Sequence, residues 1–456
     1  MQRRLKRAAG ILFALALPWI VSSCDLLDRP LPNVVIVVFD TVRADHMSAY
    51  GYPRETSPRF DAFARGATLF RTCRSTAPWT VPAHASLFTG LFPFEHGAVS
   101  YLVKKPGENV YPLPAECLTL AEALSAQGYR TAGFAANEVY LGRWTGLDQG
   151  FQTFDVRYER ARDLNQRIFR WLRVHGEKPF LLFVNYMDAH YPYNTSLDVG
   201  FLPEGASDDP TLLDSLALRV LPGRGPIPQD LRRRTIDQYD TAIAADDAAL
   251  GELLEELSRL EELENSVVVV TSDHGEYFGS HHLVAHSKDI YEPVLVVPLA
   301  IKAPGQERGR AWESPVSLVD VANLIAQRIP GRTGRCLAET FPREPGGHPM
   351  VSESYYARTK DLLNPVWGKR FRRVRRAIYD PPYKYISSSD DRNELYDLQA
   401  DVTESRNLLQ TEPDVARRLA SELKAFKSTP QTPAVGDSSV LDARQRELLE
   451  TLGYTD

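Results

Sequence analysis

The sequence predicts an α/β fold with a mostly parallel central sheet flanked by helices, followed by a smaller C-terminal α+β lobe. Two observations lead to this prediction. Continuous apolar runs rich in β-branched residues, such as residues 33–40 and 267–270, are typical of strands buried on both faces of a parallel sheet. Segments with helical periodicity separate these runs, and strands that alternate with helices indicate an α/β domain.

The other elements of this domain follow in chain order. We expect a helix around residues 118–127, a strand around 129–135, a helix around 163–174, a strand at 179–190, a long amphipathic helix at about 231–264 and a last strand within 295–305. The stretch APWTVPAHASLFTG, residues 77–90, predicts a loop that turns into a short helix. Thr80 would lie near its N-cap, Pro82 in its first turn and Gly90 near its end.

The composition becomes rich in proline and glycine near residues 342–347, which places a domain boundary at about residue 340. We therefore expect a catalytic domain at residues 25–340 and a small C-terminal lobe at 341–436. A polar tail would occupy residues 437–456. The formal net charge of −6 gives no electrostatic footprint for nucleic acid. Local basic clusters, such as residues 369–376, are expected to be solvated.

Residues 1–24 have the pattern of a lipoprotein signal peptide. MQRRLKR supplies a basic start, an apolar run follows, and VSSC resembles a bacterial lipobox that ends at Cys24. We expect lipidated Cys24 to anchor an exported protein to a bacterial membrane, facing the periplasm or the exterior. A plain cleaved signal peptide stays open as an alternative. Cys73, Cys117 and Cys336 then remain, and their spacing identifies no disulfide pair.

Residues with the chemistry of a metal site lie at two predicted strand ends. Asp40 ends the first apolar run, and Asp273 and His274 follow a later one. Ligands of open α/β sheets bind at the carboxyl ends of strands. Together with the Thr80 hydroxyl, these groups form an oxygen and nitrogen shell suited to one divalent ion: Zn²⁺, Mn²⁺, Ca²⁺ or Mg²⁺. A metal near Thr80 would make its hydroxyl a nucleophile, whereas helix capping is the alternative use of these aspartate and threonine residues.

Seven ordered segments spanning roughly residues 33–410 resemble blocks of the sulfatase branch of the alkaline phosphatase superfamily. They read NVVIVVFDTVRADHMSAYG, STAPWTVPAHASLFTG, LLFVNYMDAHYPY, YDTAIAADDAALGELL, VVVVTSDHGEYFG, HSKDIYEPVLVVPLAIKAPG and YKYISSSDDRNELYDLQADVTESRNLL. The resemblance implies that Asp40, Asp273 and His274 hold the metal. It also implies that Thr80 is the nucleophile.

The same resemblance implies roles for further residues. His190 and Lys288 match positions that contact the transferred anion or the leaving group. His84 takes a place usually held by an arginine that braces the nucleophile loop. Asn137 and His286 lie near family positions that line the pocket.

Two departures from the family pattern affect the expected reaction. Sulfatases need Cys-x-Pro-x-Arg, or a serine version, whose first residue is oxidised to formylglycine, whereas this chain has TVPAH at residues 80–84. The paired aspartates at the first strand end become Asp40 and Thr41, so one carboxylate is missing. Relatives with a threonine nucleophile are typically phosphoryl-transfer enzymes.

These features predict a metal-dependent hydrolase of phosphate mono- or diesters, or of phosphonate esters, acting through a covalent Thr80 intermediate. The substrate would be an anionic ester, such as a glycan or lipid head-group ester. One alternative is a sulfuric ester hydrolase, which rates on matched sulfate and phosphate esters would distinguish. Others are a lipid-anchored phospho-head-group transferase and a non-catalytic glycan-binding lipoprotein. The transferase would transfer its group to a sugar acceptor, and the binding protein would hold metal without turnover.

Overall fold

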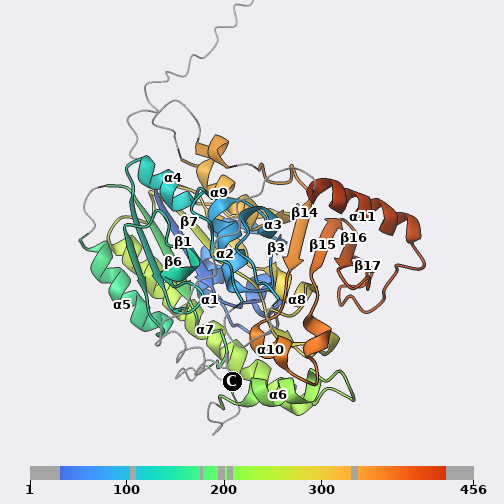
Figure 1. Cartoon of the computed structure of the whole chain (residues 1–456). Helices are drawn as coiled ribbons and strands as arrows, with labels where there is room; N and C mark the ends of the chain where they lie inside the picture. Colours follow the sequence, from blue (N-terminus) through green and yellow to red (C-terminus); the bar gives the residue numbers. More distant parts are fainter. Residues whose placement is uncertain are drawn as a thin grey trace, which may run out of the picture. The chain divides into compact units, whose positions relative to one another are not determined.

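The computed structural model describes residues 31–102, 109–174, 178–193, 201–202, 209–329, 337–341 and 343–427. Its central sheet has eight strands (Figure 1). Their spatial order is β12 (Arg310–Trp312), β2 (Thr68–Phe70), β11 (Leu299–Lys302), β7 (Ser266–Ser272), β1 (Asn33–Phe39), β6 (Phe180–Tyr186), β4 (Arg130–Ala135) and β5 (Thr153–Val156). The strands from β7 to β5 are mutually parallel. This confirms the predicted α/β class.

Helices cover both faces of the sheet because alternate residues of each buried strand point to opposite sides. Val34 and Ile36 of β1 belong to a core shared with α2 (Thr80–Thr89), α4 (Leu120–Ala126) and α9 (Val319–Ala326). Val35 and Val37 belong to the opposite core, shared with α1 (Pro58–Ala64), α5 (Ala161–Leu172) and α7 (Gln229–Arg259). Every residue of β1 is buried, which explains its continuous apolar sequence.

Several predicted elements have shifted ends or directions in the structure. The helices expected around residues 118–127, 163–174 and 231–264 are α4, α5 and α7. The strand expected within residues 295–305 is β11, which pairs antiparallel with β7. No long helix lies between β7 and β11 in the described chain, so the connection does not form the crossover that a parallel neighbour requires. Thr80 is the first residue of α2, and Trp79 occupies the N-cap.

A four-stranded antiparallel sheet follows the central domain. Its order is β14 (Met350–Ser354), β15 (Arg375–Asp380), β16 (Tyr383–Ser388) and β17 (Glu394–Asp397). Ile378 and Leu395 pack on one face with Leu419 of α11 (Pro413–Lys427). On the other face, Ala377 and Ile386 share a core with the segment around Tyr291. The second sheet therefore packs against a segment of the predicted active-site region.

Short elements complete the described chain. The strands are β3 (Cys73–Arg74), β8 (Tyr277–Phe278), β9 (Val284–Ala285), β10 (Val296–Val297) and β13 (Val316–Ser317). The α-helices are α3 (Pro93–His96), α6 (Leu212–Val220), α8 (Glu292–Leu295) and α10 (Thr359–Leu363). The 3-10 helices are η1 (Ala44–His46), η2 (Ser48–Tyr50), η3 (Arg143–Thr145), η4 (Ser280–His282), η5 (Leu337–Thr340) and η6 (Gly368–Phe371).

Several sequence predictions fall outside the described residues. These are the signal peptide and lipidated Cys24, the tail at residues 437–456, and Cys336. They stay predictions. Cys73 and Cys117 are buried and unpaired with each other. Within the described ranges, no helix combines the length and the apolar character needed to cross a bilayer.

Candidate active site

Two neighbouring strands bring the predicted metal ligands together. Asp40 directly follows β1, and Asp273 and His274 directly follow β7. Phe39 and Ser272 are partners in the parallel β1–β7 register, so the two chains leave the sheet side by side. All three side chains are fully buried. The structure therefore brings these three residues together in one cluster, as their positions at strand ends predict.

Each member of this cluster has a ligand atom without a hydrogen-bond partner. These atoms are Asp40 Oδ1, Asp273 Oδ2 and His274 Nε2. One ligand atom from each residue lies within 4.8 Å of the others. Two buried carboxylates without a counter-charge are costly, and an O, O, N donor set fits a divalent cation. The residues therefore fit a divalent metal ion, as the resemblance implies.

The other carboxylate oxygens are held in place by the protein. Asp273 Oδ1 accepts hydrogen bonds from the backbone N–H of His274 at 2.8 Å and of Thr41 at 3.1 Å. Thr41, which stands where the family has a second aspartate, donates its hydroxyl to Ala189 O at 2.7 Å. Its side chain is thus engaged away from the carboxylates. Asp40 and Asp273 keep one oxygen each for a cation.

Two asparagine side chains orient Asp40. Asn137 Nδ2 donates to Asp40 Oδ2 at 2.9 Å, and Asn185 Nδ2 lies 3.3 Å from the same oxygen. Asn137 was a candidate from the family resemblance, but Asn185 was missed. The available signal was a polar residue in the otherwise apolar β6 sequence FLLFVNY. Asn185 pairs in register with Val38 of β1, which brings it close to the strand end.

Thr80 lies at the N-terminus of α2, beside the cluster. Its Oγ1 is 3.5 Å from Asn137 Nδ2, and its interaction with Asp273 helps lower the pKa of that carboxyl against the stronger effect of burial. The residue is only 1% exposed. Helix N-termini present backbone N–H groups and a positive dipole end to anions. The geometry therefore places a hydroxyl at the N-terminal end of a helix, next to a metal-type cluster.

His84 lies one helical turn after Thr80. Its Nδ1 is 3.0 Å from Thr80 O and 3.6 Å from Asp273 Oδ2, and its Nε2 has no hydrogen-bond partner. Burial lowers the pKa of His84 to about 3. The imidazole is therefore neutral, and it cannot supply the charge of the arginine that usually occupies this place.

His190 and His286 form an imidazole wall beside the cluster. The His286 ring lies 4.6 Å from the ring of His274 and 5.1 Å from that of His190, measured between centroids. His286 Nδ1 is 3.1 Å from Glu276 Oε1, and His190 Nδ1 is 2.7 Å from Tyr191 O. Burial lowers the pKa of both imidazoles well below the usual range. Both imidazoles are therefore neutral.

Lys288 lies in the same wall and is paired with a carboxylate from the C-terminal part of the chain. Its Nζ lies 3.0 Å from Asp361 Oδ2 of α10 and donates to His286 O at 3.2 Å. Asp361 Oδ1 also accepts the indole N–H of Trp367 at 3.3 Å. Asp361 and Glu276 were both missed from sequence, because no local pattern links them to their partners.

Replacing Asp361 by asparagine is expected to move the alkaline limb of the pH–rate profile to lower pH. Burial lowers the pKa of Lys288, and the Asp361 carboxylate opposes this by favouring the ammonium. Without that carboxylate the pKa of Lys288 falls further, so the ammonium loses its proton at lower pH. At the alkaline end of the profile, we expect kcat/KM of the variant to be lower than that of the wild type by a factor of about ten or more.

Profiles of kcat/KM against pH for wild type, Asp361→Asn and Asp361→Glu would check this expectation. Asp361→Glu keeps the negative charge and should retain the wild-type alkaline limb. A uniform loss at every pH in Asp361→Asn would show that the carboxylate acts through packing rather than through the charge of Lys288.

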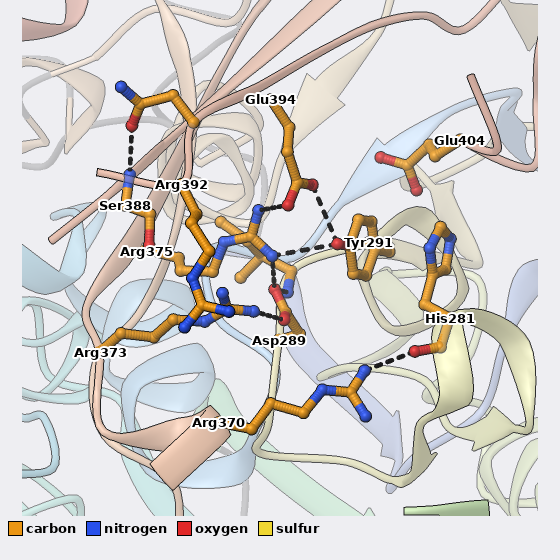
Figure 2. A network of polar contacts seen from close by, with 12 residues as sticks. His281, Asp289, Tyr291, Arg370, Arg373, Arg375, Ser388, Arg392, Glu394 and Glu404 are labelled. Carbon is orange, nitrogen blue, oxygen red and sulfur yellow. Dashed lines mark hydrogen bonds and ion pairs between the residues drawn. The ribbon is translucent and has the colours of Figure 1, made fainter. Parts of the chain in front are cut away.

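Asp289, the residue after Lys288, is fixed to the four-stranded sheet β14–β17 by a buried ion-pair network (Figure 2). Asp289 Oδ1 lies 2.5 Å from a guanidinium nitrogen of Arg375, and Oδ2 lies 2.8 Å from Arg373. Arg375 also pairs with Glu394 at 2.7 Å. The expectation that residues 369–376 are solvated was therefore wrong for Arg373 and Arg375, which are 8% and 1% exposed. Their partner Asp289 is distant in sequence, so charge counting could not identify the network.

The metal-free protein is expected to lose stability as pH rises from about 4 to about 7. Burial and the neighbouring Asp273 raise the pKa of Asp40 to about 7, and burial raises the pKa of Asp273 to about 7, from 3.8 in the unfolded chain. A raised folded pKa stabilises the protein below the unfolded value, and this contribution is lost as pH rises through the folded value. A cation that replaces the protons should restore stability above that range.

Differential scanning fluorimetry between about pH 5 and pH 8, with and without Mn²⁺ or Ca²⁺, would measure this effect. The rise in Tm on adding the ion should be larger at the higher pH. A double variant, Asp40→Asn with Asp273→Asn, corrects for all other titrating groups. If the Tm of the metal-free double variant changed with pH as much as that of the metal-free wild type, the expectation would be contradicted.

The chain matches known proteins along most of its length. A protein-family model described as Sulfatase matches residues 32–330. The chain is 26% identical over 437 residues to the Ulvan-active sulfatase of Formosa agariphila, a match that covers 85% of this chain and 79% of that protein.

Solved structures share the fold. The phosphonate monoester hydrolase of Agrobacterium radiobacter superposes with a TM-score of 0.66 at 19% identity, over 87% of this chain and 95% of that one. A putative sulfatase from Bacteroides thetaiotaomicron superposes with a TM-score of 0.68 at 18% identity, over 91% and 96% of the two chains.

Proposed function

This chain belongs to the sulfatase family of ester hydrolases, and we propose that it hydrolyses phosphate or phosphonate esters through a covalent intermediate on Thr80. The observation that carries the proposal is a threonine hydroxyl at the N-terminus of α2, beside the cluster of Asp40, Asp273 and His274. A divalent cation bound by these three residues would lower the pKa of the Thr80 hydroxyl and offset the charge of the reacting group.

Threonine limits how the intermediate can be cleared. A formylglycine hydrate has a second hydroxyl, which can expel sulfate by re-forming the aldehyde. Thr80 has a single hydroxyl, so its ester must be cleaved at phosphorus or sulfur by water or by another acceptor. The family resemblance associates threonine nucleophiles with phosphoryl transfer, which favours the phosphorus esters.

The first step forms a bond between Thr80 Oγ1 and phosphorus and breaks the bond from phosphorus to the leaving-group oxygen. His286 is the proposed proton carrier. Its Nδ1 faces the Glu276 carboxylate, which leaves Nε2 unprotonated and able to accept a proton. The Thr80 proton moves to this imidazole, and the leaving-group oxygen receives it. Glu276 stabilises the transient imidazolium.

Lys288 and the N-terminus of α2 stabilise the charge that develops on the phosphoryl oxygens. In the second step water attacks phosphorus, and the bond from phosphorus to Thr80 Oγ1 breaks. The proton of the water passes through His286 to Thr80. The products are the alcohol and the free phosphate or phosphonate, and the hydroxyl of Thr80 is regenerated.

Matched p-nitrophenyl esters with four reacting groups test the proposal. The metal-loaded protein would be assayed on p-nitrophenyl sulfate, p-nitrophenyl phosphate, bis-p-nitrophenyl phosphate and p-nitrophenyl phenylphosphonate. Higher kcat/KM on one or more phosphorus esters than on the sulfate is the expected result. The sulfatases among its relatives make sulfate hydrolysis the second candidate function. A preference for the sulfate ester would overturn the phosphorus assignment.

A further inference from the structure

A pocket of about 410 Å³ opens beside the imidazole wall. Ligand pockets for small molecules are usually about 300–1,000 Å³, so this one can hold a substantial group. Part of its lining consists of His190, His286, Lys288 and Arg358. In the description that follows, this part is called one end of the pocket. His286 is also next to the metal-type ligand His274. An ester bound with its anionic group at this end would place its leaving group in the rest of the pocket.

The rest of the pocket is lined mainly by apolar side chains, with Asp214, Lys360 and Asn364 among them. One wall is α6 and its C-terminal end, where Leu213, Ala217 and Leu221 recur every four residues and so lie on one helix face. The facing wall comes from the segment between β14 and β15 and includes Leu363 and Trp367. Figure 1 shows α6 and α10 as neighbours. Trp367 packs against the hydrophobic cluster that contains Leu221.

Several polar atoms in these walls are already hydrogen-bonded to protein atoms. Tyr191 donates its hydroxyl to Asp214 Oδ2 at 2.6 Å. Asn364 Oδ1 accepts the backbone N–H of Val366 at 2.9 Å. Asp361 accepts from Trp367 and pairs with Lys288. A sugar ring placed here would bury several of its hydroxyls. Some would lie against apolar carbon without a hydrogen-bond partner, and others would have to replace existing hydrogen bonds of the protein. Both arrangements are unfavourable.

We infer that the natural substrate has an apolar leaving group, an alkyl or aryl alcohol rather than a sugar. This inference rests on the ester hydrolysis proposed above. The leaving group lies between Leu221, which follows the last residue of α6, and Trp367 on the facing segment. The two walls thus select the leaving group, while the imidazoles, Lys288 and Arg358 face the anion.

A series of primary-alcohol esters tests this inference with leaving groups of similar basicity. The reacting group is the one that the p-nitrophenyl assay favours, and the alcohols are ethanol, butanol, octanol and the 6-hydroxyl of glucose. The expected result is a rise in kcat/KM of about fourfold per methylene until the pocket is filled. The glucose ester should be hydrolysed more slowly than the butyl ester. A flat dependence on chain length, or a faster glucose ester, would overturn the inference.

Variants of the two walls provide matched controls. Trp367→Ala and Leu221→Ala should each flatten the dependence on chain length. Trp367→Phe keeps an apolar ring but loses the indole N–H, so it should retain the dependence. Arg219→Ala alters an exposed residue of the same helix and should also retain it. Retention of the full dependence in both alanine variants of the walls would contradict the placement of the leaving group.

A binding measurement separates this inference from the proposed reaction. Alkylphosphonic acids carry the anionic group and the chain but have no ester bond to cleave. Their affinities for the metal-loaded protein, measured by calorimetry, should increase from the ethyl to the octyl compound. If no ester is hydrolysed but this increase is found, the proposed function fails and the apolar pocket stands. If esters are hydrolysed but affinity does not change with chain length, the inference fails and the proposed function stands.

Discussion

Replacing Thr80 by alanine is expected to lower kcat/KM for ester hydrolysis by ~10⁴-fold or more, the scale seen when a covalent nucleophile is removed. The hydroxyl lies 3.5 Å from Asn137 Nδ2 and interacts with the metal-type ligand Asp273. Without it, the bond from phosphorus to the enzyme cannot form. Steady-state kinetics on the preferred p-nitrophenyl ester would measure the loss. Intact-protein mass spectrometry of an acid-quenched reaction should show the covalent ester on the wild type alone.

Two controls keep this result interpretable. Thr80→Ser retains a hydroxyl at the same position and should keep far more activity than Thr80→Ala. Thr80→Ala should also still bind the metal, because the orphaned atoms of Asp40, Asp273 and His274 are unchanged. If kcat/KM of Thr80→Ala were within about tenfold of the wild-type value, Thr80 would not be the nucleophile.

The second large effect is expected from Asp273→Asn, which removes a charge with little change in shape. Metal affinity should fall by more than ~100-fold, because loss of a direct ligand should exceed the 10–100-fold effect of losing a supporting residue. Hydrolysis should fall with it. Metal content after dialysis, measured by inductively coupled plasma mass spectrometry, and calorimetric titration with Mn²⁺ and Ca²⁺ would check both affinity and ion preference.

Asp247→Asn is the matched control for this variant. Asp247 is also a buried carboxylate that accepts two backbone N–H groups, from Arg59 at 2.8 Å and Phe60 at 2.7 Å. It does not belong to the cluster of Asp40, Asp273 and His274. Its substitution should leave metal content unchanged even if it lowers stability. Full metal occupancy in Asp273→Asn would exclude Asp273 as a ligand.

The sequence allowed prediction of those parts of the site that depend on local pattern. Asp40 and Asp273 follow strands whose apolar runs are easy to identify, and parallel neighbours in a sheet end at the same edge. Thr80 follows from the helix-start pattern, since Pro82 and Gly90 mark the two ends of α2. The family blocks added His190 and Lys288, which the structure places in the pocket lining.

Residues whose roles depend on distant partners could not be predicted in this way. Asp361 is 73 positions from Lys288 in the numbering, and no periodicity relates the two. Arg375 is in a basic stretch that resembles a solvated surface, yet it is buried against Asp289 and Glu394. The antiparallel direction of β11 depends on how the chain returns to the sheet, which the composition of the strand does not record. Such pairings are properties of the tertiary structure.

The segment between β14 and β15 supplies Arg358, Asp361 and Trp367 to the pocket, whereas Asp40, Thr80 and Asp273 come from the central sheet and α2. Loops between strands tolerate insertion and deletion far better than buried strands do. During evolution, changes in the length of this segment could therefore alter which alcohol is accepted while the strands that carry the reacting groups keep their register. The same separation gives protein engineers one contiguous piece of chain to exchange between relatives.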